Sequence, residues 1–254
     1  MTISLVVLRC RTSDRTDGAG RGAEALGRSL GERLGIEPRI VGSAGDARPA
    51  DWSDDLRESR GCILEAGGQV DDALARGAFP VLLASDCSIC LTTLAAVARH
   101  VPEARFLWLD AHGDFNTPDT TPSGFLGGMC LAASCGRWQV EGGVGGDRFI
   151  DPSRVHFLGV RDLDPGEEAE VVAAGVSAEI PDGVPLYVHL DTDVLDPSVM
   201  AAQFPVPDGW DARRLRAQLA ELAAGCRIVG VEITALEDES AVEVVAEALA
   251  PLLE

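Results

Sequence analysis

Short apolar runs alternate with longer amphipathic stretches along almost the whole chain. The apolar runs are rich in Val, Leu and Ile and lack polar alternation, as in strands that are covered on both faces. They lie at Ile3–Leu8, Arg39–Gly42, Phe79–Ala84, Arg105–Asp110, Val155–Val160, Pro185–Asp191 and Ile228–Thr234. The amphipathic stretches repeat apolar residues at helical spacing, at Gly22–Leu34, Ser53–Arg76, Ile89–His100, Pro165–Ala174, Ala212–Ala224 and Ser240–Leu253.

This alternation predicts an α/β fold in which a mostly parallel central sheet lies between two layers of helices. The sequence has no internal repeat, low-complexity tract or linker, so residues 1–254 are interpreted as a single domain. The glycine-rich piece Glu141–Asp147 is the best loop candidate. Ligands of such sheets bind beyond the carboxyl ends of the strands, so we expect the chemistry just after the apolar runs.

The chain is strongly acidic. It carries 21 basic side chains, all of them arginine, against 41 acidic ones, which gives a net charge of −20. Without a cationic surface to neutralise phosphates, binding to nucleic acid or to anionic lipid is disfavoured. The hydrophobic content of 46% is enough for a buried core and excludes wholesale disorder.

We expect a cytoplasmic protein. The N-terminal run Ile3–Leu8 is too short for the core of a signal peptide, and no basic residue precedes it. No stretch approaches the roughly 18 to 20 apolar residues that a membrane span needs. In the cytosol the seven cysteines are expected to be reduced thiols that form no disulfide framework.

Two of the apolar runs end in acidic clusters. In each cluster three possible metal ligands are spaced by two residues, so an extended backbone points them to one side. They are Asp110, His112 and Asp114 in the first cluster and His189, Asp191 and Asp193 in the second. Carboxylates that converge at neighbouring strand ends repel one another, and a divalent cation such as Mn²⁺ is a natural compensation. Solvated loop acids are the alternative interpretation.

Three segments around these clusters resemble the arginase (ureohydrolase) family. They are Asp110–Asp114 with the following Asn116–Pro118, then Gly159–Glu167, and then Leu190–Pro197. The resemblance runs from about Pro80 to the C-terminus in consistent order. It implies a three-layer α/β/α sandwich and a dinuclear manganese cluster bridged by a hydroxide that attacks a guanidino carbon.

The resemblance also implies roles for individual residues. Asp110 and Asp191 would bridge two Mn²⁺ ions, Asp114 would complete the shell of one ion, and His112 and Asp193 that of the other. Asp114 is also a candidate catalytic residue. Residues that match substrate-binding positions of the family point to an amino acid with free α-carboxylate and α-ammonium groups. They are Asn116 and Ser123 for the carboxylate, Asp164 for the ammonium and, as a weaker match, Glu167.

One departure from the family pattern is a cysteine among the metal ligands. The family motif of two glycines, aspartate, histidine and serine appears here as Ala84-Ser85-Asp86-Cys87-Ser88, so Cys87 replaces a histidine ligand. A thiolate binds metal but is softer than imidazole, which makes manganese less certain here than in the family. Two alternatives are an inert buried thiol and a redox or zinc pair with Cys90.

A second departure removes a proton donor. Arginases have a proton-shuttling histidine where this chain has Gly127, and an asparagine where it has Phe125. Loss of a general acid typically costs about 10²- to 10⁴-fold in rate. The cysteine and the missing histidine together resemble family members of antibiotic biosynthesis that cleave Nω-hydroxy-L-arginine to hydroxyurea and L-ornithine. We therefore expect this less basic substrate in place of L-arginine.

Two further residues have open roles. His189 is interpreted as a substitute proton donor, as a group that orients a metal ligand, or as a structural histidine. Glu232 is our choice for the glutamate that holds the guanidine group, with Glu237 nearby and Ala235 in the best-matching position.

Two other functions and the state of assembly also stay open. A hydrolase of another guanidino or formimino acid fits the same motifs, and so does a non-catalytic metal-binding descendant. We favour a monomer over a homo-oligomer.

Overall fold

A computed structural model describes residues 1–140, 144 and 148–253. The chain forms one seven-stranded sheet with strand order β2-β1-β3-β7-β6-β4-β5, and all paired strands run parallel. The strands are β1 (Ile3–Leu8), β2 (Arg39–Val41), β3 (Phe79–Leu83), β4 (Arg105–Leu109), β5 (Val155–Leu158), β6 (Pro185–Asp191) and β7 (Arg227–Thr234). The α/β prediction with a parallel central sheet is therefore confirmed.

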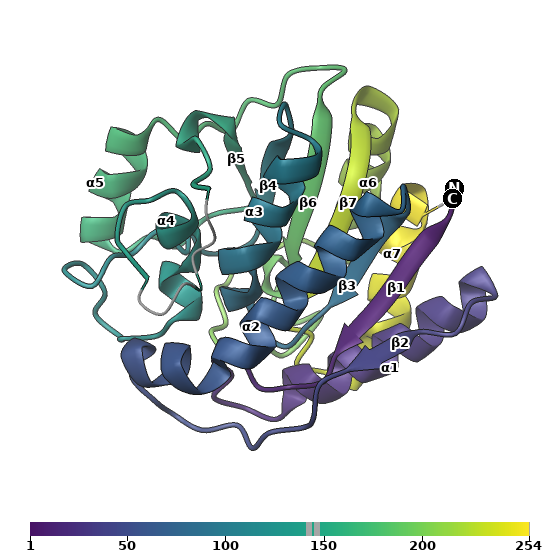
Figure 1. Ribbon diagram of the computed structural model, residues 1–254, viewed down its shortest axis with the longest axis horizontal. Helices are drawn as coiled ribbons and strands as arrows, with labels where there is room; N and C mark the ends of the chain where they lie inside the picture. Colours follow the sequence, from purple (N-terminus) through teal and green to yellow (C-terminus); the bar gives the residue numbers. More distant parts are fainter. Residues whose placement is uncertain (141–143, 145–147, 254) are drawn as a thin grey trace.

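Helices cover both faces of the sheet, as Figure 1 shows with α2 and α3 in front of it and α6 and α7 behind it. The helices are α1 (Gly18–Leu34), α2 (Trp52–Ala75), α3 (Cys90–His100), α4 (Cys130–Ser134), α5 (Pro165–Ala174), α6 (Ala212–Gly225) and α7 (Val242–Leu253). All six predicted helices are present, with shifts of up to four residues at their ends. The short α4 was not predicted, because five residues are too few to show a helical period.

The alternation of side chains along each strand divides the core in two. In β1, Leu5 and Val7 join the cluster packed under α1, α6 and α7, whereas Val6 and Leu8 join the cluster packed under α2, α3 and α4. Both clusters consist of buried hydrophobic residues, which explains why the strands read as continuous apolar runs. The three-layer sandwich predicted from the sequence is confirmed.

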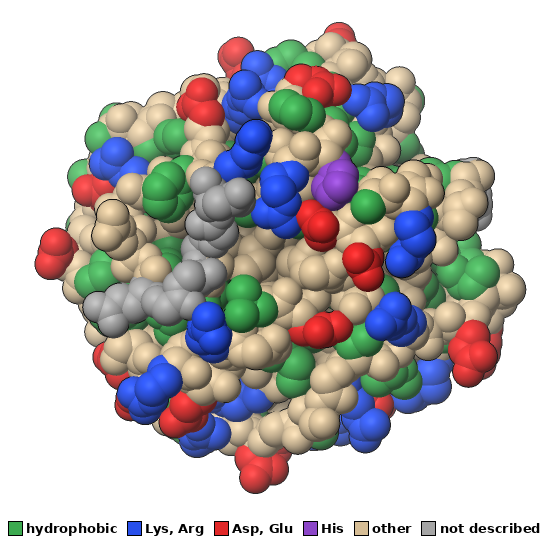
Figure 2. Space-filling view, in the orientation of Figure 1, with side chains coloured by type: hydrophobic (Ala, Val, Ile, Leu, Met, Phe, Trp, Pro, Cys, Tyr) green, Lys and Arg blue, Asp and Glu red, His purple; other side chains and the backbone are tan. Residues whose placement is uncertain are grey.

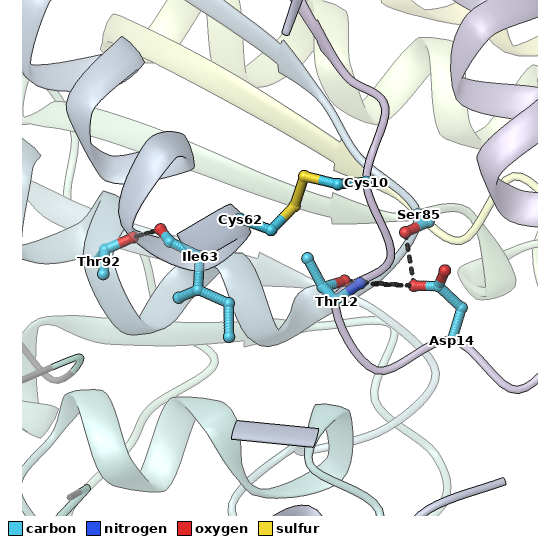
Figure 3. Close-up of a disulfide and its surroundings, with 7 residues drawn as sticks. All are labelled: Cys10, Thr12, Asp14, Cys62, Ile63, Ser85 and Thr92. Atoms are coloured by element: carbon cyan, nitrogen blue, oxygen red, sulfur yellow. Dashed lines mark hydrogen bonds between the residues drawn. A yellow bond between two sulfur atoms is a disulfide. The ribbon is translucent and has the colours of Figure 1, made fainter. Parts of the chain in front are cut away.

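A disulfide corrects the expectation that all cysteines are reduced. Cys10, just after β1, is bonded to Cys62 in α2, with Cα atoms 6.0 Å apart (Figure 3). The five other cysteines are free. The two partners are separated by 52 positions in the sequence, and only the packing of α2 beside the end of β1 brings them together, so the sequence did not reveal the pair.

Two remaining expectations concern a glycine-rich loop and membrane-spanning helices. The glycine-rich loop predicted at Glu141–Asp147 lies outside the described residues, apart from Val144. Within the described part of the chain, no helix has the length and apolar character to cross a membrane.

Candidate metal centre and active site

A cavity of about 430 Å³ opens at the carboxyl ends of the central strands. Its lining combines acidic side chains with apolar ones that include Phe125, Phe204 and Val206. The six predicted metal ligands all contribute to its lining, namely Cys87, Asp110, His112, Asp114, Asp191 and Asp193. They lie at or just after the carboxyl ends of β3, β4 and β6. These strands are separated in sequence, but their carboxyl ends lie along the same edge of the parallel sheet.

The backbone at each strand end fixes the direction of the carboxylates. The backbone N–H of His112 donates to Asp110 (2.7 Å), and that of Asp193 donates to Asp191 (2.7 Å). Asp193 also accepts from the backbone of Ala111 across the strand gap (3.2 Å). Asp114 has a φ of 49°, a left-handed conformation that costs energy outside glycine. The chain thus accepts local strain where an acidic side chain has to face the cavity.

Two groups of ligand atoms are close enough to hold ions, and they share one carboxylate. Cys87, Asp110 and His189 form the first group, and Asp110, His112 and Asp193 form the second; the ligand atoms of each group lie within 4.8 Å of one another. In the second group His112 Nδ1 is 3.0 Å from Asp193 Oδ2. A carboxylate common to two ion sites is the arrangement that a dinuclear centre requires.

The charges of this cluster are poorly compensated by the protein. Burial, followed by the charge of Asp193, raises the pKa of Asp110 to about 6. Burial and neighbouring carboxylates also raise the pKa values of Asp114 and Asp191 well above the usual range. Burial alone would lower the pKa of His112, but its hydrogen bonds to Asp110 and Asp193 raise it to about 12.

These residues fit divalent cations. Asp110 Oδ2 is buried and has no hydrogen-bond partner among the described residues, which is unusual for a buried carboxylate oxygen. Carboxylate, imidazole and thiol groups together supply a donor set that divalent metals accept once the thiol is deprotonated. Bound cations would satisfy the free oxygen and offset the repulsion among the acids.

The predicted substrate-binding side chains gather on the rim of the cavity. Asn116, Ser123, Asp164 and Glu167 all line it, and Asn116 Nδ2 donates to Asp164 Oδ2 (2.9 Å). Glu167 is itself engaged, because it accepts hydrogen bonds from the backbone N–H groups of Phe115 (2.7 Å) and Asp164 (3.0 Å). Glu167 and Asp164 form a reciprocal capping box that holds the start of α5 in place.

Two predicted residues lie below the cavity. Glu232 and His189 are 0% and 1% exposed and do not contribute to its lining, so neither is placed to touch a substrate there. The glutamate that does reach the lining is Glu237, beside Ala235. The sequence placed His189 on the face of Asp191 correctly, but two residues of strand, about 6.6 Å, separate them in depth.

Gly127 lies against a phenylalanine ring. A Cβ atom added to Gly127 would come within 2.5 Å of Phe125 Cε1 and 2.9 Å of Asp86 Oδ2. The space that a side chain at this position needs is therefore filled by Phe125. Phe125 in turn packs against Phe204, with ring centroids 4.9 Å apart.

Sequence reasoning missed two residues of the site. Asp86 lines the cavity, and burial, followed by the charge of Asp14, raises its pKa to about 6. Its position directly before Cys87 in the quoted motif was the available signal. Phe204 also lines the cavity and approaches His112, with ring centroids 6.4 Å apart. No motif marks Phe204, because it lies in an irregular segment outside both acidic clusters.

The sequence matches the arginase family over residues 12–250. The chain belongs to this family. The resemblance noted in the sequence is thereby confirmed, and so is its consequence that the chain is a metal-dependent hydrolase that acts on C–N bonds of linear amidines.

Individual relatives match over nearly the whole chain. The Nω-hydroxy-L-arginine amidinohydrolase of Streptomyces lavendulae is 34% identical over 265 residues, covering 99% of this chain and 95% of the relative. Among solved structures, arginase from Bacillus caldovelox superposes with a TM-score of 0.82 at 30% identity, covering 99% of this chain and 97% of that one. Arginase from Bacillus cereus superposes with a TM-score of 0.84 at 26% identity, covering 99% and 98%.

Proposed function

We propose that the chain hydrolyses Nω-hydroxy-L-arginine to hydroxyurea and L-ornithine with two Mn²⁺ ions. One water molecule adds to the guanidino carbon, the bond from that carbon to Nδ breaks, and the δ-amine of ornithine leaves with a proton. Two similarities support the proposal. The chain belongs to the arginase family, and it is similar along its whole length to the hydroxyarginine amidinohydrolase of S. lavendulae.

The packing at Gly127 is the observation that carries the choice of substrate. Glycine has no group that transfers a proton, and the Phe125 ring occupies the room that a donor side chain would need. A cationic guanidinium with a poor leaving amine depends strongly on a general acid. N-hydroxylation lowers the basicity of the guanidine and adds an OH group of its own, so the hydroxylated substrate depends less on a donor from the protein.

The six ligands that line the cavity would hold the ions. When bound, the ions supply a water molecule whose pKa is lowered towards neutrality. Asn116 and Ser123 would bind the α-carboxylate and Asp164 the α-ammonium group, and all three line the cavity. The Asp114 carboxylate faces the same cavity and is our candidate for carrying a proton to the leaving Nδ. Phe125 and Phe204 supply apolar lining that would limit the access of water to the cavity.

The cellular setting is part of the same proposal. We place the enzyme in the cytoplasm, as a monomer, in antibiotic biosynthesis that consumes hydroxyurea. The mixture of acidic and basic side chains, with only small apolar areas between them on the face in Figure 2, supports a monomer. Measurement of the molar mass in solution by light scattering tests that part.

The decisive experiment compares substrates on the manganese-loaded protein. Nω-hydroxy-L-arginine, L-arginine and agmatine are assayed under identical conditions, with hydroxyurea, urea and the amine products quantified separately. We expect kcat/KM for the hydroxylated substrate to exceed that for L-arginine by about a hundredfold or more, as for a missing general acid. Asp164→Asn should raise KM for the amino acid substrates more than it lowers kcat. Comparable kcat/KM for L-arginine contradicts the proposal.

A further inference from the structure

A buried chain of hydrogen-bonding side chains supports Cys87 from below the cavity. His189 Nε2 lies 3.3 Å from Cys87 Sγ. On the other side of the ring, His189 Nδ1 lies 2.7 Å from Glu232 Oε1. Glu232 Oε2 accepts a hydrogen bond from the Tyr187 hydroxyl at 3.0 Å. The sulfur is thus the outer end of a continuous Tyr187–Glu232–His189–Cys87 chain.

The sheet itself holds this chain rigidly. His189 of β6 and Glu232 of β7 are paired residues in the strand register, so their side chains start side by side. The His189 ring stacks on Trp108 of β4, with centroids 3.6 Å apart and planes 2° from parallel. All three inner members are at most 1% exposed, which leaves them no contact with solvent or substrate. Tyr187 and Glu232 therefore reach the cavity only through His189, whose Nε2 faces Cys87.

The surroundings of Cys87 show which hydrogen-bond partners its sulfur has and which it would need as a thiolate. Its sulfur is 2.9 Å from Asp191 Oδ2 and 3.2 Å from Thr234 Oγ1. A thiolate ligand at this place would face a carboxylate on one side, and such a group needs a hydrogen-bond donor on another. His189 Nε2 is the ring nitrogen in contact with the sulfur. Both ring nitrogens of His189 thus have a partner within the chain, Cys87 Sγ for Nε2 and Glu232 Oε1 for Nδ1.

We propose that His189 is a positioning residue whose Nε2 hydrogen-bonds the Cys87 sulfur and fixes it as a ligand of the first metal ion. Glu232 and Tyr187 hold the ring in the orientation that this bond requires. Outer partners of this kind commonly change metal affinity by about 10- to 100-fold. The inference rests on the proposed metal centre and adds a reason why a cysteine can replace the histidine of the family.

The test measures metal binding, with no use of the enzymatic reaction. Protein loaded with Co²⁺ reports a thiolate ligand by a charge-transfer band in the near ultraviolet, and titration gives Kd for each ion. We expect the band in the unmodified protein and its loss in Cys87→Ser. His189→Leu should weaken and shift the band and raise Kd of the first ion about 10- to 100-fold. His189→Gln, whose amide nitrogen takes the place of Nε2, should restore both.

A double-mutant cycle separates the effect of this contact on metal affinity from a general disruption of the fold. In a Cys87→Ser background, His189→Leu should not raise Kd of the first ion further, because the partner sulfur is gone. His156 is a matched control, since it is 2% exposed on the edge strand β5 and contacts none of the ligands. His156→Gln should leave band and Kd unchanged.

Several outcomes would overturn the inference. An unaltered band and Kd in His189→Leu would show that the contact is only structural. Equal loss in His189→Gln and His189→Leu would show that the imidazole ligates the ion directly. A protein that binds no cation would overturn both this inference and the proposed function. Two tightly bound ions and an intact cycle without hydrolysis of Nω-hydroxy-L-arginine would overturn the proposed function alone.

Discussion

Gly127 and Phe125 form a steric pair in the wall of the active-site cavity. The ring of Phe125 lies where the first side-chain atoms of any residue at 127 would be. The proton-shuttling histidine of the arginases thus cannot be restored by one substitution without moving this ring. Residue 125 and residue 127 therefore have to change together.

This pairing gives a prediction for Gly127→His. The single variant should lose about 1–3 kcal/mol of unfolding free energy from overpacking and should gain little activity on L-arginine. Gly127→His combined with Phe125→Asn should recover most of the stability and raise kcat/KM for L-arginine. Chemical denaturation and steady-state kinetics measure the two effects. Phe125→Asn alone is the control, and equal stability of both Gly127→His proteins would contradict the steric pair.

At the scale of single residues, the sequence predicted positions that periodicity and motif spacing define. Asp110 and Asp191 lie at strand ends, and strand parity with the parallel sheet brings them to one cavity. The same reasoning did not show that His189 and Glu232 lie below the cavity, because parity gives the face of a strand but not the depth at which a side chain meets the cavity. Depth depends on where each strand stops relative to its neighbours, which sequence alone does not provide.

At the scale of elements, the end of β1 is tied to α2 and to the active site. Cys10 is bonded to Cys62, and the next residue, Arg11, forms a buried ion pair with Asp55 of α2 (2.5 Å). Asp14 accepts a hydrogen bond from Ser85 (2.5 Å), two residues before Cys87, as Figure 3 shows. The loop after β1 therefore connects α2 to the segment that carries the thiol ligand.

Removal of the disulfide tests the contribution of this connection. Cys62→Ser should lower the unfolding free energy by about 2–4 kcal/mol under oxidising conditions, because the cross-link restricts the unfolded chain. Thermal and urea denaturation, with and without a dithiol reductant, measure the loss. Reductant should lower the stability of the unmodified protein but not that of Cys62→Ser. Cys226→Ser, which removes a free and partly exposed thiol, is the matched control. A response of Cys62→Ser to the reductant would contradict this assignment.

The bounds of helices and strands were predictable from the sequence where local signals mark their ends. The strand at Pro185–Asp191 and the helix at Pro165–Ala174 have the predicted bounds, because proline and a run of apolar residues mark them locally. The start of α1 was placed four residues late. Gly18 there packs closely against Glu237, so its place in the helix is set by a contact distant in sequence and not by local propensity.

At the scale of the whole molecule, the fold concentrates acidic charge at one edge of its sheet. The chain has a net charge of −20, yet the carboxylates that matter most are the few buried ones around Asp110. Burial raises the pKa of Asp110 from its ordinary 3.8 to about 6, so without metal the folded state holds a proton that the unfolded state releases. This carboxyl therefore destabilises the metal-free fold fully above pH 6, and the penalty disappears as the pH falls towards 3.8.

Metal removal should consequently destabilise the protein more at pH 8 than at pH 5. Chelated protein should have a lower Tm than manganese-loaded protein, because an ion that binds only the folded state at 100 times its Kd adds about 2.7 kcal/mol. That corresponds to roughly 5–11 °C for a domain of this size. Asp110→Asn removes the carboxylate common to both ion sites. Its chelated form should therefore be at least as stable as the unmodified chelated protein, while its Tm should hardly respond to manganese. Calorimetry at both pH values measures these differences, and a strong manganese response in Asp110→Asn would contradict a centre in which both ions depend on this residue.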